Sequence, residues 1–338
     1  MSFRVGIAGV SGYTGIELVR ILASHPGVAI TWLGAGKAAG EPLGATWPGV
    51  DLGLPVGPVD AAAIAAACDL VFLALPHGVS APVARDCLAA GVRVVDLGAD
   101  FRLKDAAAYA QAYGAPHPVP DLLAEAVYGL PEKHRDAIAR ARLVANPGCY
   151  PTATAIAALP LVEDGLVDWL VADCISGISG AGRSPGPRNL YCEVQESAGA
   201  YSPAGAHRHT PEIEQELGVP VTFTPHLAPL RRGMTATVSA RLRPGHGLDT
   251  AALRARYAAR YAGHPMVRVT DTPPASREVR GTALARVCPV VDTARGVVTV
   301  MSAIDNLGKG ASAQAVHNMN LLLGLPEAQG LPTLPEYP

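Results

Sequence analysis

The chain has 338 residues, of which 49% are hydrophobic and 17% charged, and its formal net charge is −2. This length predicts about two domains, and the composition excludes a disordered chain and a basic nucleic-acid-binding surface. The opening MSFRVGIAGV lacks the layout of a signal peptide, and no apolar stretch is long enough to span a membrane. Six scattered cysteines without a C-x-x-C pair favour a reducing compartment. We therefore expect a soluble, cytoplasmic protein without nucleic-acid or membrane partners.

The first half of the chain alternates strand patterns with helix patterns. The predicted strands are 5–8, 28–33, 70–75 and 92–97, and the predicted helices are 11–24 and 79–90. The segment 70–75 is apolar throughout, as a strand buried on both faces would be. Such alternation predicts an α/β fold with a parallel, doubly wound sheet.

The pattern changes after about residue 148. Segments rich in β-branched residues alternate with helix-like ones: strands 219–224, 234–242 and 297–304, and helices 210–217 and 253–261. These segments predict an antiparallel sheet with helices, an α+β domain. Residues 309–323 return to a helical pattern, and the tail from Gly324 is rich in proline.

A glycine-rich turn lies between the first predicted strand and the first predicted helix. Its sequence is Gly9-Val-Ser11-Gly12-Tyr13-Thr14-Gly15. A dinucleotide pyrophosphate binds backbone N–H groups at a helix N-terminus, where side chains would hold it away. The turn therefore predicts a dinucleotide site. The alternative is a tight turn that needs glycine only for its backbone conformation.

The choice of dinucleotide depends on the residues after the second strand. NAD-binding proteins usually place an acidic residue there, but this chain has Leu33-Gly-Ala-Gly36-Lys37. Lys37 could contact a 2′-phosphate, so we expect NADP. The alternative is that Lys37 is an ordinary solvated lysine.

Cys149 differs from the other five cysteines in its surroundings. It lies in Asn146-Pro-Gly148-Cys149-Tyr-Pro151-Thr, directly before a helix-like run. Pro151 suits the first turn of a helix, so Cys149 is expected at the helix N-terminus. The positive end of the helix dipole favours the reactive thiolate there. Cys149 is the candidate nucleophile.

His207 and His209 are candidate proton-transfer residues for such a thiol. In an extended segment, residues two apart point the same way, so both rings could serve one site. A zinc site is the alternative, but no cysteine or acid completes a ligand set at a familiar spacing, so we expect no metal. A purely structural role for one of the two histidines stays open.

Two further segments suit an anion. Ser176-Gly-Ile-Ser179-Gly180-Ala-Gly-Arg183 could hold phosphate through backbone donors and the Arg183 guanidinium. Arg102 follows the strand at 92–97, at the sheet edge where such folds bind ligands. Either arginine could instead belong to a structural ion pair.

These motifs, taken together, resemble the N-acetyl-γ-glutamyl-phosphate reductases, a branch of the aspartate-semialdehyde dehydrogenase superfamily. The resemblance covers nearly the whole chain and rests on seven stretches in the same order: 9–15, 75–78, 99–102, 146–152, 179–182, 207–212 and 304–310. One departure is Gly36-Lys37, where many relatives carry Ser-Arg. Relatives that act on a carrier-bound aminoadipyl phosphate show Gly-Cys-Asn, whereas this chain has Gly-Cys-Tyr150, which favours the glutamyl substrate.

The resemblance implies a domain plan and a set of site residues. It implies a Rossmann-type domain at 1–148, which is completed by residues 310–338 with their C-terminal helix. It also implies an α+β domain at 149–309. The protein would form homo-oligomers, either dimers or tetramers. Pro76 and Asn306 would join the glycine-rich turn and Lys37 at the cofactor. Arg102, Asn146, Ser179, Gly180 and Arg183 would bind the substrate and its phosphate.

The implied reaction is the NADPH-dependent reduction of N-acetyl-γ-glutamyl phosphate to N-acetylglutamate 5-semialdehyde in arginine biosynthesis. Cys149 would form a thioester, with His207 preferred as acid/base and His209 as an orienting neighbour. The alternative substrate is a carrier-bound aminoadipyl or glutamyl phosphate of lysine or ornithine synthesis. Two other classes are a dinucleotide-binding protein without catalysis, which would lack the nucleophile, and a non-phosphorylating aldehyde dehydrogenase, which would need a carboxylate to activate water.

Overall fold

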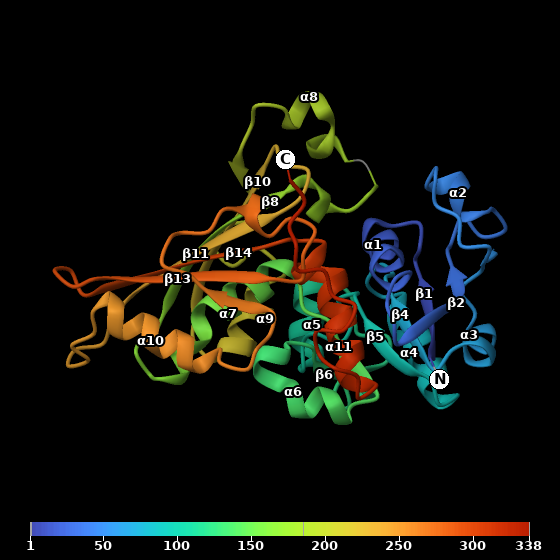
Figure 1. Cartoon of the computed structure of the whole chain (residues 1–338), viewed down its shortest axis with the longest axis horizontal. Coiled ribbons are helices and arrows are strands. Elements are labelled where there is room, and N and C mark those ends of the chain that lie inside the picture. Colours follow the sequence, from blue (N-terminus) through green and yellow to red (C-terminus); the bar gives the residue numbers. More distant parts are fainter. Residues whose placement is uncertain (1, 185, 338) are drawn as a thin grey trace. The chain divides into compact units, whose positions relative to one another are not determined.

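The computed structural model describes residues 2–184 and 186–337, and it divides into two compact units (Figure 1). The first unit comprises Met1–Pro147 and Ala311–Pro332, and the second comprises Gly148–Gly310 and Thr333–Pro338. The sequence analysis assigned all of 310–338 to the first domain. The tail after Pro332 instead belongs to the second unit, because the backbone of Glu336 pairs with Arg280 of that unit.

The first unit is built on a seven-stranded sheet in which every neighbouring pair is parallel, in the order β3-β2-β1-β4-β5-β7-β6. The strands are β1 (Phe3–Ala8), β2 (Val28–Gly34), β3 (Val56–Gly57), β4 (Leu70–Leu73), β5 (Arg93–Asp96), β6 (Val127–Tyr128) and β7 (Leu143–Ala145). The order runs outward in both directions from β1 and β4, which confirms the predicted doubly wound sheet.

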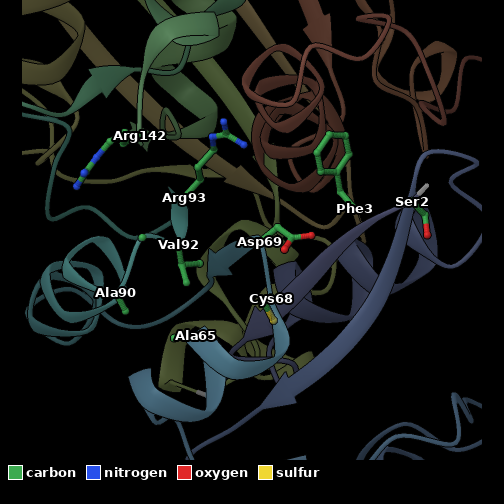
Figure 2. A pocket seen from close by; sticks show the side chains of 10 residues that line it. Ser2, Phe3, Ala65, Cys68, Asp69, Ala90, Val92, Arg93 and Arg142 are labelled. Carbon is green, nitrogen blue, oxygen red and sulfur yellow. The ribbon is translucent and has the colours of Figure 1, made fainter.

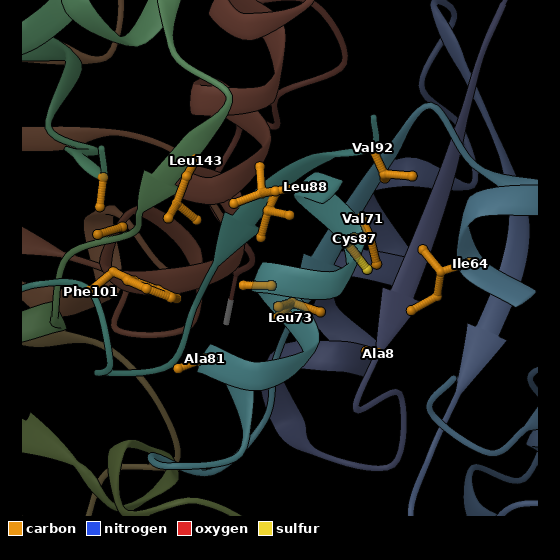
Figure 3. Packing of buried hydrophobic residues seen from close by; sticks show 14 of the residues in the cluster. Ala8, Ile64, Val71, Leu73, Ala81, Cys87, Leu88, Val92, Phe101 and Leu143 are labelled. Atoms are coloured by element: carbon orange, nitrogen blue, oxygen red, sulfur yellow. The ribbon is translucent and has the colours of Figure 1, made fainter. Parts of the chain in front are cut away.

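Helices flank this sheet and close its core. They are α1 (Tyr13–Leu22), α2 (Leu43–Thr46), α3 (Ala61–Ala67), α4 (Ser80–Ala89), α5 (Ala106–Tyr113), α6 (Pro131–Arg140) and α11 (Ala313–Leu322), with a 3₁₀ turn η1 (Pro120–Leu122). Figure 3 shows the packing of Val71 and Leu73 of β4 with Cys87 and Leu88 of α4 and Ile64 of α3. All five side chains are buried, so this layer holds the carboxyl end of β4 in place.

The second unit also contains a seven-stranded sheet, in the order β12-β13-β14-β11-β8-β10-β9. The strands are β8 (Leu170–Gly177), β9 (Gly199–Ala200), β10 (Val221–Ala228), β11 (Met234–Arg241), β12 (Val267–Val269), β13 (Ala285–Asp292) and β14 (Val297–Ile304). The sheet is mixed, because the pairs β8–β10 and β12–β13 are parallel. The prediction of an antiparallel sheet was wrong for these pairs. A parallel pair needs a long connection, and the segment between β8 and β10, which includes a helix, is such a crossover.

The helices of the second unit are α7 (Cys149–Glu163), α8 (Tyr191–Val194), α9 (Thr210–Leu217) and α10 (Thr250–Arg260). Three short 3₁₀ turns, η2 (Ile178–Ala181), η3 (Pro187–Asn189) and η4 (Ser276–Glu278), and a π-helical turn η5 (Gly308–Ser312) complete the elements. Helix α7 packs on β11, β13 and β14 and against α9, and it is buried over nearly its whole length.

Polar side chains also fix α7 along its axis. Ser302 Oγ donates to the carbonyl of Ala153, and Tyr257 Oη donates to that of Ala157. Because these contacts come from a strand and from another helix, α7 can neither slide nor rotate without breaking buried hydrogen bonds. The position of its first residue, Cys149, is therefore set by the core of the second unit.

Candidate active site

The glycine-rich turn between β1 and α1 has a backbone that other residues could not adopt. Gly9 has φ +94°, and a Cβ atom there would lie 2.1 Å from the carbonyl oxygen of Ala74. A Cβ atom at Gly15 would lie 2.3 Å from the carbonyl oxygen of Gly9. These two glycines are required by the turn itself, so their presence alone does not separate the two interpretations offered above.

Gly12 separates them better. It is the N-cap of α1, and no side chain caps the helix there. A Cβ atom at Gly12 would meet only the carbonyl oxygen of Gly9, at 3.5 Å, so the fold itself has room for a side chain. The N-terminus of the helix thus lies at the carboxyl edge of a parallel sheet, and its N-cap residue carries no side chain. This arrangement fits a dinucleotide pyrophosphate, which needs close approach to the backbone N–H groups of a helix N-terminus.

The other predicted cofactor residues of this turn are Ser11, Tyr13 and Thr14. The ring of Tyr13 lies 6.1 Å from that of Trp47, whose Nε1 donates to the carbonyl of Val10. The carbonyl of Thr14 accepts from Ser312 Oγ at 2.8 Å, and Ser11 is half-buried. Trp47 was missed by sequence reasoning, because nothing in the local pattern marks it as the support of a loop 37 residues away.

Lys37 and Pro76 are exposed in the loops that follow β2 and β4. Both loops lie at the same carboxyl edge of the sheet as Gly9. The turn after Pro76 is held by Asp100, whose carboxylate accepts the N–H groups of Gly78 at 2.7 Å and Ala81 at 3.0 Å. Asp100 therefore shapes the start of α4, a role that the sequence analysis did not assign.

Arg102 and Asn146 have protein partners. Arg102 is buried; its Nε donates to the carbonyl of Asn146 and its Nη2 to that of Leu97, both at 2.9 Å. The Asn146 side chain donates to the carbonyl of Ala311 and accepts from Asn318 Nδ2, each at 3.1 Å. The structure thus binds Arg102 to the ends of β5 and β7 through backbone carbonyls. These contacts with the backbone were not predicted from the sequence.

The prediction that Cys149 begins a helix is confirmed. Gly148 is the N-cap of α7, and its carbonyl accepts both the N–H and the Oγ of Thr152 at 3.0 Å. The N–H of Gly148 donates to Glu212 Oε1 at 2.9 Å. Cys149 is partly accessible, whereas four of the other cysteines are buried and Cys192 is exposed.

Glu212 was not singled out in the sequence, although it ends the 207–212 stretch. It lies in the first turn of α9, and its side chain is 1% exposed. Its contact with Gly148 bridges 64 positions of the chain and joins the loop before the nucleophile to the helix after the histidines. This hydrogen bond orients the start of α7.

His207 and His209 lie side by side, but not for the predicted reason. The segment before α9 is a turn rather than an extended strand, and the rings meet with centroids 4.8 Å apart. His207 Nδ1 accepts the backbone N–H of His209 at 3.1 Å. Burial, followed by the nearby charge of Arg208, lowers the pKa of His207 to about 4. His207 is therefore neutral at pH 7, and since Nδ1 is an acceptor, its proton is on Nε2.

Tyr150 connects the nucleophile to these histidines. Its ring centroid lies 5.7 Å from that of His207 and 5.9 Å from that of His209. Its hydroxyl donates to the carbonyl of His226 and accepts from Tyr201 Oη, both at 3.1 Å. Burial raises the pKa of Tyr201 to about 12, so this hydroxyl pair stays protonated. The residue after Cys149 thus packs directly on both candidate proton-transfer groups.

Backbone hydrogen bonds attach the predicted anion loop to residues 230–233. The N–H groups of Gly177, Ile178 and Ser179 donate to the carbonyls of Gly233, Leu230 and Arg231. These three donors therefore do not point to an anion. Gly180 follows them in η2, where a Cβ atom would lie 3.1 Å from Ser176 Oγ, and Arg183 is exposed just beyond Gly182.

Asn306 is buried, and its amide joins two loops of the second unit. Its Nδ2 donates to Ser179 Oγ at 2.9 Å, and its Oδ1 accepts the N–H of Gly233 at 2.7 Å. The same segment ends beside the nucleophile, because a Cβ atom at Gly310 would lie 2.7 Å from Cys149 Cβ. Stretches 179–182 and 304–310 are thus brought together with Cys149 in one unit.

Two cavities lie away from the predicted site residues. The first, about 790 Å³, is at the amino edge of the parallel sheet, and Figure 2 shows Cys68, Asp69, Arg93 and Arg142 around it. This edge is opposite to the one that carries Gly9 and Pro76. The second, about 640 Å³, lies between β10 and α8 and includes Tyr201 in its wall.

Over residues 2–184 and 186–337, no group of three or more His, Cys, Asp or Glu side chains gathers as metal ligands would. None of the helices in those ranges is long and apolar enough to cross a membrane.

Comparison with known proteins identifies both halves of the chain. Residues 4–141 match the family described as semialdehyde dehydrogenase, NAD binding domain, and residues 149–306 match semialdehyde dehydrogenase, dimerisation domain. The chain is 48% identical to proteins of Ectopseudomonas mendocina (97% of each chain covered) and Symbiobacterium thermophilum (100% of each), and 46% identical to one of Geobacter sulfurreducens (99% of each). All three are named N-acetyl-gamma-glutamyl-phosphate reductase. The chain belongs to this reductase family.

Solved structures confirm the fold of the reductase chain. Aspartate semialdehyde dehydrogenase II of Vibrio cholerae, complexed with ASA, aligns with a TM-score of 0.73 at 17% identity and covers 96% of this chain and 99% of its own. The Candida albicans enzyme, solved with NADP, aligns at 0.72 with 16% identity over 96% and 99%. At such identities the likeness concerns the fold alone. The predicted family, fold class and enzyme class, an oxidoreductase with a nicotinamide-dinucleotide-binding domain, are confirmed.

Proposed function

We propose that this chain reduces N-acetyl-γ-glutamyl phosphate to N-acetylglutamate 5-semialdehyde with NADPH, through a thioester on Cys149, in arginine biosynthesis. The names of relatives 46–48% identical over nearly the whole chain support the substrate. The observation that carries the chemistry is the start of α7. Cys149 is its first residue, Glu212 holds its N-cap, and both histidines pack on Tyr150.

Most of the residues that would hold the cofactor are in the first unit, and Asn306 would join them from the second. The uncapped start of α1, at Gly12 to Gly15, would bind the pyrophosphate, and the loop after β4, with Pro76, would border it. Lys37, exposed after β2, would meet the 2′-phosphate, which supports NADP as the dinucleotide. When bound, NADPH supplies the hydride that reduces the thioester carbon.

Cys149 would open the reaction by attacking the acyl phosphate carbonyl. The S–C bond forms, the C–O bond to phosphate breaks, and phosphate leaves with the electron pair. The α7 dipole favours the thiolate, and backbone N–H groups of the first turn would hold the oxyanion, a donor being worth roughly 3–4 kcal/mol. Pro151 supplies none of these donors, so they come from Cys149 and Tyr150.

His207 would act as a hydrogen-bond donor rather than as an acid/base. Its neutral form carries the proton on Nε2, because Nδ1 accepts the N–H of His209. Such a group can stabilise the alkoxide formed when the thioester is reduced. That alkoxide then collapses to the aldehyde and expels the Cys149 thiolate without needing a proton of its own. His207 would thus contribute to the oxyanion hole, and any group that exchanges protons would be His209.

Arg183 is the better candidate of the two arginines for the phosphate. It is exposed after Gly182, whereas Arg102 is buried and donates to two backbone carbonyls. The released phosphate carries more charge than the acyl phosphate, so a guanidinium favours release into this site.

The second unit supports a homo-oligomer through the open face of its sheet. Helices α7 and α10 cover one face, where Val238 and Val300 are buried. On the other face Ile175 is 44% exposed and Met301 is half-buried, while their cross-strand neighbours are Thr235 and Thr237. This sheet lies within the dimerisation domain of the family, so we propose that a second copy covers it.

The reverse reaction tests the proposal. We expect sustained turnover of NADP⁺ with N-acetylglutamate 5-semialdehyde only when inorganic phosphate is present. Repeated turnovers without phosphate would contradict the acyl phosphate product. No reduction by a folded sample that binds NADP⁺ would contradict the small substrate and favour a carrier-bound one.

A further inference from the structure

The loop between β10 and β11, residues 229–233, is a junction in the second unit. The carbonyls of Leu230 and Arg231 accept the N–H groups of Ile178 and Ser179, and the N–H of Gly233 donates to Asn306 Oδ1. The 305–310 turn and the Ser179 loop are therefore both attached to the 229–233 loop. A shift of the 229–233 loop would move both of them.

Asp305 anchors the 305–310 turn to the same 229–233 loop. Its buried carboxylate pairs with Arg232 Nε at 2.7 Å, and the Arg232 side chain is 9% exposed. The same carboxylate accepts the N–H groups of Leu307 at 2.9 Å and Gly308 at 3.1 Å, and that of Gly281. Buried ionic groups of this kind tolerate little displacement, because the charge would lose its partners.

The C-terminal tail contacts the opposite side of this anchor. The N–H of Glu336 donates to the carbonyl of Arg280 at 2.9 Å, and Arg280 Nη2 donates back to the carbonyl of Glu336 at 2.8 Å. The Glu336 side chain covers Gly281, since a Cβ atom there would lie 2.8 Å from it. Gly281 is the residue that donates to Asp305, so one residue separates the tail from the anchor.

The path continues to the nucleophile without a gap. The N–H of Gly310 donates to the carbonyl of Asp305 at 2.8 Å, and Gly310 packs on Cys149. On its other side the 305–310 turn packs tightly against Thr282, because a Cβ atom at Gly308 would lie 2.2 Å from the carbonyl oxygen of Thr282. A displacement of Asp305 would therefore move Gly310 and change its packing on Cys149.

We propose that the C-terminal strap, residues 333–337, positions the 305–310 turn against Cys149 and so sets the reactivity of the thiol. The strap adds little to the core, because Leu334 is 85% exposed and Tyr337 63%. Its contacts are polar and directed at Arg280 and Gly281. A purely structural tail would bury apolar side chains instead. This inference deepens the proposed function and rests on it for the role of Cys149.

The test compares the full chain with a chain that ends at Pro332, both carrying Cys192→Ser. Because the other four cysteines are buried, alkylation by iodoacetamide then reports on Cys149. We expect the shortened chain to stay folded, to be alkylated severalfold faster, and to lose about tenfold in kcat with an unchanged KM for NADP⁺. Leu334→Ser in the full chain changes a side chain that is 85% exposed and leaves the contacts of Glu336 in place, so it should match the parent.

Equal alkylation rates and equal kcat for the two folded chains would overturn the proposal. A loss of activity that only follows the unfolded fraction, measured by circular dichroism, would overturn it as well and leave a structural role. If the full chain itself shows no phosphate-dependent reduction, the proposed function fails, but the alkylation comparison still decides whether the strap acts on Cys149.

Discussion

The two units of this chain carry their candidate site residues in different ways. In the first unit the site is local backbone: Gly9, Gly12 and Gly15 lie within one turn, and each is explained by a steric contact or a helix start. In the second unit the site is assembled over long distances, since Gly148 meets Glu212 and Ser179 meets Asn306. A local site is visible in residue spacing, whereas an assembled site needs the fold.

The largest expected effect separates chemistry from cofactor binding. Cys149→Ser should lower kcat by at least about 10³-fold, because the hydroxyl is a far weaker nucleophile than the thiolate. The dissociation constant for NADPH, measured by fluorescence titration, should stay unchanged, since the glycine-rich turn, Lys37 and Pro76, which would hold the cofactor, are in the other unit. Cys192→Ser is the matched control and should keep full activity. A Cys149→Ser protein that is folded but no longer binds NADPH would contradict this division of roles.

The next effect concerns the local site. Gly9→Ala places a Cβ atom 2.1 Å from the carbonyl oxygen of Ala74 at φ +94°, so we expect a loss of stability of roughly 2–3 kcal/mol and of most NADPH affinity. Gly36→Ala is the control for stability, because nothing lies within 4 Å of the added atom. Urea unfolding and NADPH titration measure both. Similar unfolding midpoints for the two variants would refute the steric account.

The fold class and the central strands β1, β2, β4 and β5 of the first unit could be predicted from mostly apolar runs, and the end of α4 from Gly91, with φ +84°. The strands β3, β6 and β7 were missed, because two or three residues are too short to show a pattern. The parallel pairs of the second sheet could not be predicted, because alternation within a strand does not reveal the direction of its neighbour. The histidine pair was found, but an extended segment was assumed where a turn brings the rings together.

A smaller effect tests the assembled site. Glu212→Gln replaces the carboxylate that accepts the N–H of Gly148, so kcat should fall about tenfold while the protein stays folded. Glu214→Gln is the matched control on the same helix, because Glu214 accepts the N–H of Val221 on β10 instead. It should leave kcat unchanged. Equal activities of the two variants would mean that the orientation of α7 does not depend on Glu212.

The predicted NADP preference rests on one exposed side chain. Lys37→Ala should raise the KM for NADPH about fivefold and leave that for NADH unchanged, because an exposed charge contributes about 1 kcal/mol. The difference should shrink at high salt. An unchanged ratio of the two KM values would show that Lys37 is an ordinary solvated lysine.

Asp96 should have the smallest effect on the rate. Its expected effect is on how the unfolding free energy depends on pH. Burial, and then repulsion by Asp100, raises its pKa from 3.8 to about 7; Arg102 and the Gly98 N–H partly oppose this. Because the folded state holds the proton more tightly, the unfolding free energy should fall as pH rises from about 4 to 7. Asp96→Asn should reduce this fall, as measured by urea unfolding across that range. Asp86 is exposed, so Asp86→Asn should leave this fall in the unfolding free energy unchanged.

The contribution of His207 to the unfolding free energy should change with pH in the opposite direction to that of Asp96. Its pKa is lowered to about 4 from 6.5, so its contribution to stability is present above pH 6.5 and is lost as pH falls toward 4.

What the sequence could not reveal in the candidate site is the set of supporting residues. Asp100, Glu212, Arg232 and Asp305 hold the backbone of the loops, and each acts on a residue far away or in another element. Their own surroundings in the sequence carry no pattern for such roles. Arg102 shows the converse, because its position at a sheet edge indicated an anion site, whereas its guanidinium binds backbone carbonyls.

The most direct test of the central claim is the capture of the acyl group on Cys149. Incubation with N-acetylglutamate 5-semialdehyde and NADP⁺ without phosphate should give one equivalent of NADPH per active site and an N-acetylglutamyl adduct, which mass spectrometry places on the peptide that contains Cys149. Added phosphate should release the adduct and restore turnover. A burst of NADPH with no adduct on that peptide, or with the adduct on another residue, would contradict the account.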